Sequence, residues 1–276
     1  MELEKKIQQA IRLLQSYKGE QPIEVAYSGG KDSDVILELA KMAGINYRAI
    51  YKCTTIDPPH TIAHCKSKGV EIMKPKEKFF DLVKRNGLPN RSYRFCCKYL
   101  KEYKILDNAI HGIRRSESIK RAQRYSEPVA CRTYGSKSEH VNVYLPILDW
   151  SDEDVEKFIA MRGIKCHPLY YDEQGNFHVE RRLGCIGCPL ASRHKRVVAF
   201  IERPKFLKRL IYCAKIHWEG HPNMRTRQLY KSIYEKLYRE MFCNSYSDFI
   251  KKTQRNLFGE EFDAKAYLEK YFNIEL

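Results

Sequence analysis

The sequence has no apolar run approaching the roughly 18 residues that a membrane-spanning helix requires, so we expect no membrane partner. Its first residues, MELEKKIQQAIRLLQ, place acids and glutamine where a secretory signal peptide needs an apolar core. Internal repeats and low-complexity linkers are also lacking, which argues against a repeat architecture. These absences together predict a soluble, cytoplasmic protein.

Acidic residues are scarce relative to basic ones. The 276 residues include 50 Lys and Arg against 34 Asp and Glu, a formal net charge of +16. Such an excess favours an anionic partner, either a nucleic acid or a nucleotide, although a highly charged soluble surface gives the same balance. The ten cysteines are spread along a lysine-rich chain without a secretory signal, which favours metal binding or redox chemistry over disulfides.

The positive charge is concentrated late in the chain. Residues 189–240 contain 13 Lys and Arg against 4 Asp and Glu, a net charge of +9. Tyr230, Tyr234 and Tyr238 recur there at helical spacing. Aromatic side chains among basic ones can stack on nucleic-acid bases, but the same spacing describes the packing face of an amphipathic helix. The second interpretation is the more economical one.

Apolar periodicity predicts alternating strands and helices over the first part of the chain. The expected strands are IEVAY (23–27), YRAIY (47–51) and VEIM (70–73). The expected helices include 3–14, 35–42, a segment through His64, 76–86 and 151–162, the last with Ser151 as N-cap, Asp154 in a capping box and Gly163 at its end. This alternation predicts an α/β fold of Rossmann-like type, three α/β/α layers around a mostly parallel sheet. Only helical patterns follow Cys188, so we expect a nucleotide-binding domain over 1–190 and a basic helical region over 191–276.

The segment SGGKDS, residues 28–33, lies between the first expected strand and its helix. In doubly wound folds ligands bind at the carboxyl ends of strands, where glycines let the backbone approach an anion and a helix N-terminus favours negative charge. Ser28, Gly29, Gly30, Lys31, Asp32 and Ser33 therefore form a candidate phosphate site, with hydroxyl donors, a cation, and a carboxylate for a metal ion or for orienting the loop. The spacing fits neither the G-x-x-x-x-G-K-S/T loop nor G-x-G-x-x-G.

Several segments in order resemble one superfamily over residues 20–195. SGGKDS resembles the pyrophosphate loop of the ATP pyrophosphatases, the PP-loop or HUP-type fold. The segments GIRRSES (112–118), LPILDWSDEDVEKFI (145–159) and HPLYYDEQG (167–175) resemble those of the phosphoadenylyl-sulfate (PAPS) reductase family. Cys96 and Cys97, with Cys185 and Cys188, resemble the four-cysteine set that binds a [4Fe-4S] cluster in its adenylyl-sulfate branch.

The four cysteines also suit metal binding on chemical grounds. Thiolates bind either an iron–sulfur cluster or Zn²⁺, and a Cys-x-x-Cys turn chelates both. The adjacent pair Cys96 and Cys97 is unusual for zinc, which favours the cluster, although either cysteine can be a small buried hydrophobe. Among the remaining cysteines, Cys53 follows the second expected strand and is the candidate to carry sulfur.

Two departures from the reductase pattern bear on function. The reductases carry a catalytic cysteine in a C-terminal motif, and this sequence has no cysteine after Cys243. Their phosphate loop is also degenerate, because a sulfonucleotide has no β,γ-pyrophosphate, whereas SGGKDS is intact. The resemblance therefore implies an enzyme that uses ATP and Mg²⁺, an ATP pyrophosphatase that adenylates an acceptor oxygen for replacement by sulfur.

Among relatives with these features, the DNA phosphorothioation proteins (DndC-like and SspD-like) are the most similar. That resemblance implies DNA as partner and acceptor, with a cysteine desulfurase as sulfur donor. Lys31, Asp32 and Arg114 are the expected catalytic residues, Arg114 contacting the nucleotide near its α-phosphate or the acceptor. A sulfonucleotide reductase, an ATP-dependent tRNA thiolase and a nucleotide or nucleic-acid binding module without turnover stay open as alternatives.

Overall fold

The computed structural model of the protein describes residues 2–134, 139–222, 225–254 and 261–276. The chain divides into two compact units, and each is built from two segments. Unit 1 comprises Met1–Pro75 and Lys98–Gly184, and unit 2 comprises Lys76–Cys97 and Cys185–Leu276.

Unit 1 is built on a sheet whose strand order is β3-β2-β1-β4-β6-β5. The strands are β1 (Ile23–Tyr27), β2 (Tyr47–Lys52), β3 (Glu71–Met73), β4 (Asn108–Ile110), β5 (Val129–Tyr134) and β6 (Glu139–Tyr144). All neighbouring pairs are parallel except β5 and β6, which are antiparallel. The predicted α/β class with a mostly parallel sheet is confirmed, and the antiparallel edge pair was not foreseen.

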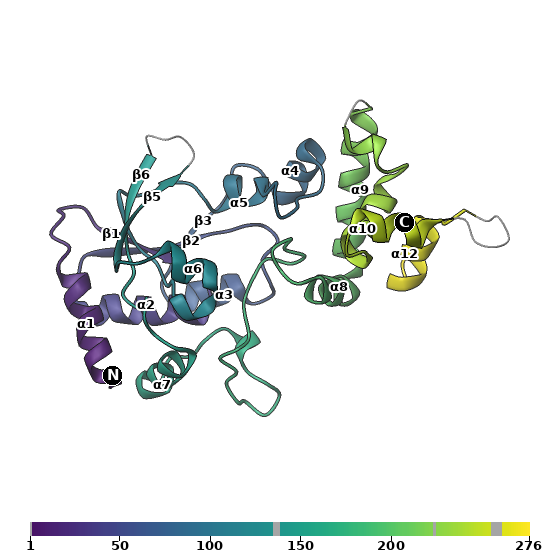
Figure 1. Ribbon diagram of the computed structural model, residues 1–276. Coiled ribbons are helices and arrows are strands. Elements are labelled where there is room, and N and C mark those ends of the chain that lie inside the picture. The colour runs from purple at the N-terminus through teal and green to yellow at the C-terminus, as the bar shows by residue number, and fades with distance from the viewer. Residues whose placement is uncertain (1, 135–138, 223–224, 255–260) are drawn as a thin grey trace. The chain divides into compact units, whose positions relative to one another are not determined.

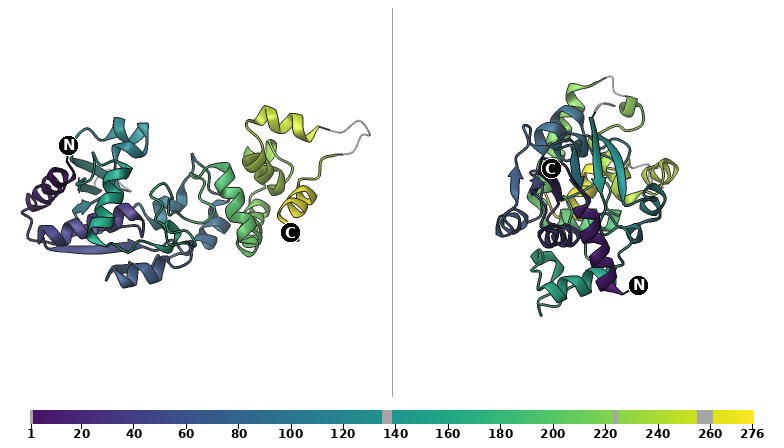
Figure 2. Two further views of the ribbon diagram at one scale, coloured as in Figure 1. Left: turned by 90° about the horizontal axis from the view of Figure 1, so that it is seen from below. Right: turned by 90° about the vertical axis from the view of Figure 1, so that its left-hand side faces the viewer.

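Four helices of unit 1 share a buried core on one face of this sheet: α1 (Leu3–Gln15), α2 (Lys31–Ala43), α3 (Thr61–Ser67) and α7 (Asp152–Arg162). Helix α6 (Ile119–Arg124) contributes no residue to that core. Helix α2 packs on β1, and both α1 and α7 pack on α2. The N-terminal helix, purple in Figures 1 and 2, lies beside α2 in each view. Ile23, Val25 and Tyr27 alternate toward this layer and join its buried core.

The opposite face of the sheet is covered differently along its width. Near β4 and β6, Ala109, Val141 and Val143 form a second buried cluster with Tyr125, which follows α6. Glu24 and Ala26 of β1 also point to this side, but they line a cavity. The side of the sheet near β1 and β2 therefore keeps polar groups available to a ligand.

The predicted capping signals of α7 are confirmed, and α2 has a glycine cap of the same kind. Ser151 Oγ accepts from the Asp154 amide at 3.1 Å, and the Asp154 carboxylate accepts from the Ser151 amide at 2.8 Å. Gly163 ends α7 at φ 59° and Gly44 ends α2 at φ 64°, both in the left-handed region that glycine adopts at low cost. These caps fix where the two helices begin and end around the site described below.

The regular elements of unit 2 that the structure describes are all helices. Its helices are α4 (Phe79–Asn86), α8 (Arg193–Glu202), α9 (Pro204–Gly220), α10 (Ile233–Phe242), α11 (Tyr246–Thr253) and α12 (Ala264–Phe272), while α5 (Phe95–Leu100) spans the point where the chain passes to unit 1. Helix α4 packs against α9, and the rings of Phe79 and Phe80 lie 6.4 and 5.4 Å from that of Phe206.

This packing corrects the expected division at residue 190. The region after residue 190 is helical, as predicted, but it does not form a unit alone, because α4 supplies the apolar surface that covers α9. Within the described residues, no helix is both long and apolar enough to span a membrane.

Candidate nucleotide site and cysteine cluster

The SGGKDS segment forms a tight loop between β1 and α2, as predicted. Gly29 has φ 79°, and a Cβ built there would lie 3.1 Å from a Leu183 methyl and 3.2 Å from Thr61 Cγ2. A side chain at Gly29 would therefore strain the backbone before it met any ligand. Ser33 closes the loop, donating from its amide at 2.9 Å and its hydroxyl at 2.7 Å to the Gly30 carbonyl.

The loop opens into a cavity of about 300 Å³ at the carboxyl ends of β1 and β4. The segment after β4 contributes His111, Gly112 and Ile113 to its lining. A Cβ on Gly112 would lie only 2.9 Å from the Asp32 carbonyl oxygen, so glycine permits the close approach of this segment to α2. In open α/β sheets the crevice between such neighbouring strands is where ligands bind.

Three basic residues line this cavity. Lys31 is 3% exposed, and its Nζ lies 3.3 Å from Asp32 Oδ2 and 5.6 Å from the centre of the Tyr170 ring. Arg121 forms an ion pair with Glu117, and Arg182 donates to the Glu117 carbonyl at 3.3 Å. Burial, together with the nearby Arg182, lowers the pKa of Arg121. Because a bound anion would relieve the repulsion between these cations, the cavity is suited to phosphate groups.

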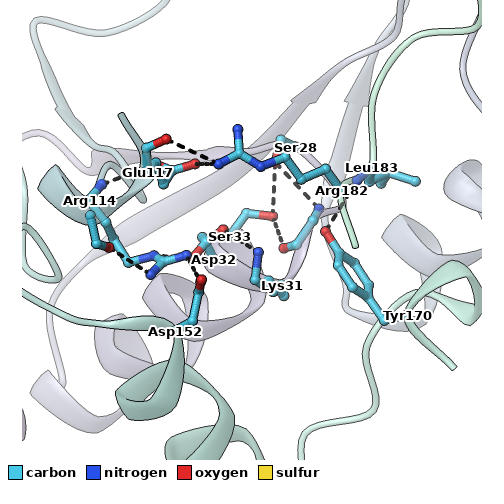
Figure 3. A network of polar contacts seen from close by, with 12 residues as sticks. Ser28, Lys31, Asp32, Ser33, Arg114, Glu117, Asp152, Tyr170, Arg182 and Leu183 are labelled. Atoms are coloured by element: carbon cyan, nitrogen blue, oxygen red, sulfur yellow. Dashed lines mark hydrogen bonds and ion pairs between the residues drawn. The ribbon is translucent and has the colours of Figure 1, made fainter. Parts of the chain in front are cut away.

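Arg121 and Arg182 were not foreseen from the sequence. Arg121 lies in α6, and Arg182 lies in a segment without regular structure, shown with the loop residues in Figure 3. Neither belongs to a recognisable motif, and only the general excess of basic residues pointed toward them. The fold brings both to the same cavity from distant positions in the chain.

Arg114 lies beside the loop but is bound to protein groups. Its side chain is 1% exposed, and its Nε donates to Asp32 Oδ1 at 2.7 Å. A terminal nitrogen donates to Asp152 Oδ1 at 2.6 Å, and the other lies 3.1 Å from Ser116 Oγ (Figure 3). Arg114 is absent from the lining of the cavity. The structure thus favours Arg114 as a positioning residue for Asp32, in contrast to the expected direct contact with nucleotide or acceptor.

A second cavity of about 350 Å³ adjoins the first on the face of β1 to which Glu24 and Ala26 point. The two share lining residues, among them Ser28, His111 and Arg121. Burial and the nearby cations Arg132 and Lys52 lower the pKa of His111 to about 3. His111 is therefore neutral near pH 7 and offers an uncharged hydrogen-bonding group where the two cavities meet.

Cys53 is outside both cavities. Its Sγ lies 3.4 Å from Asp57 Oδ2, and burial, with the Asp57 carboxylate, raises the pKa of the thiol. A thiol nucleophile needs the opposite shift, because the thiolate is the reactive form. The expectation that Cys53 carries sulfur therefore gains no support from its surroundings.

The four candidate ligand cysteines all belong to unit 2. Cys96 and Cys97 are adjacent at the start of α5, and the Cys188 amide donates to the Cys185 carbonyl at 3.2 Å in a turn where Gly187 has φ 66°. A hydrogen bond to Cys97, followed by burial, raises the pKa of Cys96, and Cys185 adds to the shift. Burial raises the pKa of Cys188, with smaller contributions from Cys185 and Cys97.

The four thiols are thus close enough to influence one another. Among the residues that the structure describes, however, no three or more His, Cys, Asp or Glu side chains are arranged so that they could hold a metal ion. The donor set is of the right type for a soft metal or an iron–sulfur cluster, since thiolates bind both.

The tyrosines of the basic segment have a packing role. Tyr238 is 5% exposed and lies in a buried cluster with Phe249, against which Tyr230 and Tyr234 also pack. The amphipathic-helix interpretation of their spacing is therefore the correct one. Arg196 of the same segment pairs with Glu240 at 3.7 Å, with both side chains almost buried.

Comparisons with known proteins agree on the type of domain. Residues 22–191 match the profile of the phosphoadenosine phosphosulfate reductase domain. An uncharacterised protein of Methanocaldococcus jannaschii is 31% identical over 188 residues, covering 62% of this chain and 37% of that protein. A phosphoadenosine 5′-phosphosulfate reductase of Alkalilimnicola ehrlichii is 31% identical over 75 residues, covering 26% of this chain and 27% of that protein. The chain spans less than half the length of these curated relatives.

The alignments with solved structures are weaker. A PAPS reductase from Candida auris, crystallised with phosphate, aligns with a TM-score of 0.46 at 15% identity, covering 66% of this chain and 93% of that chain. An FMN adenylyltransferase from Candida glabrata aligns with a TM-score of 0.43 at 13% identity, covering 61% of this chain and 58% of that chain.

The depressed pKa of His111 predicts an acid-sensitive fold. Between pH 7 and pH 5 the unfolded state takes up a proton on His111 that the folded state does not bind, so stability falls as the pH drops below about 6.5. The expected loss from this residue at pH 5 is about 2 kcal/mol. In His111→Gln the difference between urea unfolding free energies at pH 7 and pH 5 should shrink by that amount. An unchanged difference would contradict the assignment.

Proposed function

The chain belongs to the phosphoadenosine phosphosulfate reductase domain family, and we propose that it binds ATP and cleaves it between the α- and β-phosphates. An oxygen of an acceptor attacks the α-phosphorus, the bond to the β-bridging oxygen breaks, and pyrophosphate leaves. A sulfur nucleophile then replaces the adenylated oxygen, which departs with AMP. The enzyme would thus be an ATP pyrophosphatase that prepares an acceptor for sulfur transfer.

One observation carries this proposal: the intact SGGKDS loop opens into a cavity that also holds Lys31, Arg121 and Arg182. Three cations are more than one sulfate ester requires, and they match the charge of a β,γ-pyrophosphate. The loop amides and the hydroxyls of Ser28 and Ser33 add hydrogen-bond donors. These groups would stabilise the leaving pyrophosphate as its charge develops.

Asp32 and the serine hydroxyls are oxygen ligands of the kind that Mg²⁺ prefers. When bound, the ion would neutralise part of the charge on the departing pyrophosphate. Arg114, through its 2.7 Å bond to Asp32, holds one carboxylate oxygen, while Lys31 lies near the other. The carboxylate is thereby oriented before the nucleotide arrives.

For the acceptor we propose a non-bridging oxygen of a DNA backbone phosphate, as in DNA phosphorothioation. Activity with RNA and not with DNA would assign the acceptor to RNA instead. The support is the positive charge of residues 189–240. Because the raised pKa of Cys53 makes it a poor sulfur carrier, we propose a separate cysteine desulfurase as the sulfur donor. A thiol reductant would reduce its persulfide, so that the sulfur enters at the oxidation level of sulfide.

For the four cysteines of unit 2 we propose a [4Fe-4S] cluster, with Zn²⁺ as the alternative. Cys96 and Cys97 would supply two ligands from α5. Cys185 and Cys188 would supply the other two from the turn that they form. Their thiols would release protons on binding, because both metals take the thiolate form. The cluster would supply either structural cross-linking or redox chemistry, and no step above depends on it.

Asp32→Asn tests the role of the carboxylate. The substitution keeps the side-chain shape but removes the charge, so pyrophosphate release from ATP should fall about 10²-fold, or roughly 3 kcal/mol of transition-state stabilisation. Asp152→Asn is the matched control, because it removes the other carboxylate bound to Arg114 and should cost less than about tenfold. Equal losses in both variants would mean that the Arg114 network, and not the Asp32 charge, matters for turnover.

The same assay tests the reaction itself, with single- and double-stranded DNA and with RNA as acceptors. Wild-type protein, kept anaerobic and reduced, should release pyrophosphate. If it releases none yet binds adenylyl sulfate or its 3′-phosphorylated form, then a reductase-like activity replaces the ATP proposal.

Metal analysis tests the cysteine site. Anaerobically purified protein should contain iron and acid-labile sulfide in near-equal amounts, and Cys97→Ser with Cys188→Ser should lose both. Cys131→Ser, an exposed cysteine of unit 1, serves as control and should retain them. Stoichiometric zinc without sulfide would replace the cluster with the zinc alternative.

Salt dependence tests the nucleic-acid proposal. Arg193→Glu with Lys195→Glu should weaken DNA binding and reduce the slope of affinity against salt by about two, because two phosphate contacts are lost. Lys5→Glu with Lys18→Glu makes the same charge change in unit 1 and should have little effect. Arg196 is left intact, because its replacement would leave Glu240 unpaired and almost buried. Equal weakening in both double variants would indicate a general charge effect.

A further inference from the structure

A larger cavity, of about 630 Å³, lies on another side of α2 and shares no lining residue with the candidate nucleotide cavity. Helix α2 contributes Asp34, Leu37, Glu38 and Lys41, spaced so that they share one face. The remaining lining comes from α3, from the residue before it, and from the residues at and after the end of α7. It includes His60, His64, Lys68, Arg162, Lys165 and Cys166. Its volume is typical of sites for small organic ligands.

Three lysines border this cavity without an anionic partner. Among the described residues, Lys41, Lys68 and Lys165 make no side-chain hydrogen bond or ion pair, whereas Arg162 is held by Glu38 at 2.7 Å. Like charges that converge on one concave surface attract an anion and are stabilised by it. Lysines on an open surface do not by themselves distinguish a ligand site from a charged surface. The polar groups in the floor of the cavity make that distinction.

The floor contains a buried acid–histidine pair. Asp34 is 2% exposed and accepts hydrogen bonds from the Tyr27 hydroxyl at 2.5 Å and from His64 Nε2 at 3.1 Å to each carboxylate oxygen. Because a carboxylate only accepts, Nε2 must carry a hydrogen, and in neutral His64 the acceptor is then Nδ1. Nδ1 has no protein partner among the described residues, and His64 is part of the cavity lining.

The three lysines and the free acceptor His64 Nδ1 together limit which chemical class of ligand fits the cavity. The lysines suit a multiply charged oxyanion, and Nδ1 of the neutral imidazole can accept a hydrogen bond from a donor on the same ligand. A phosphate group satisfies both conditions, because near neutral pH it keeps a proton part of the time while it carries negative charge. Sulfate and carboxylate groups are fully deprotonated there and offer no donor.

We propose that this cavity is a second ligand site, for a small phosphorylated molecule whose phosphate binds Lys41, Lys68 and Lys165 and donates to His64 Nδ1. The rest of the molecule occupies the remaining volume, with Leu37 and Ile164 as apolar contacts. This site is separate from the nucleotide site and does not rest on the proposed reaction. Tyr27 directly precedes the phosphate loop, and its hydroxyl donates to Asp34 in the floor of this cavity. One hydrogen bond therefore links the two sites.

Titration of ¹⁵N-labelled protein with inorganic phosphate tests the proposal, because NMR separates the two sites. The amide signal of Gly163 reports on this cavity, and that of Gly112 reports on the nucleotide cavity. The Gly163 signal should shift saturably with phosphate and less with sulfate at equal ionic strength. An unchanged Gly163 signal, or equal affinity for the two anions, would overturn the proposal, and tighter binding of citrate would assign the site to carboxylates instead.

Substitutions then locate the contacts. Lys68→Gln with Lys165→Gln should weaken phosphate binding at Gly163 by about tenfold or more and leave the Gly112 response unchanged. Lys66→Gln is the matched control, because Lys66 is an exposed lysine of α3 outside the lining. His64→Gln should abolish the preference for phosphate over sulfate. An effect of Lys66→Gln equal to that of the double variant would reduce the site to a diffuse charge effect and overturn the proposal.

Discussion

The arrangement of the candidate nucleotide site depends on one buried guanidinium. Arg114 binds Asp32, in the first turn of α2, and Asp152, in the first turn of α7, while its own backbone follows β4. A buried cation without these carboxylates would be strongly destabilising, so three segments distant in sequence are held together at one point. Arg114 does not line the cavity, so it holds the loop without occupying the space available to a ligand.

The balance of charge around the loop follows from this arrangement. Asp32 is shared between Arg114 and Lys31, and Glu117 is shared between Arg121 and Arg182. With Asp152, which also pairs with Arg114, three carboxylates therefore face four cations, and the surplus charge is positive. A phosphate-bearing ligand supplies the missing negative charge and reduces the repulsion between the guanidinium groups of Arg121 and Arg182.

The sequence predicted those strands, helices and caps that depend on interactions between residues close together in the chain. The strands expected at 23–27 and 47–51, the helix expected over 35–42 and the capping box of Ser151 are confirmed, because each depends on residues close together in the chain. The antiparallel β5 was missed because its buried and exposed residues alternate weakly at a sheet edge. Arg121 and Arg182 were missed because their shared cavity exists only after the chain has folded. Arg114 was singled out by its motif, but its partners Asp32 and Asp152 could not be read from the sequence.

The division of unit 2 into two segments has a consequence for how the protein is made. Helix α4 leaves the ribosome long before α9, the helix against which its phenylalanines pack, and the second segment of unit 1, Lys98–Gly184, is synthesised between them. During that interval the apolar face of α4 is without its native cover, whereas the sheet of unit 1 receives its last strands, β4, β5 and β6, before α9 is made. Unit 1 can therefore fold before unit 2, and α4 is expected to be an aggregation-sensitive segment until the C-terminal helices are synthesised.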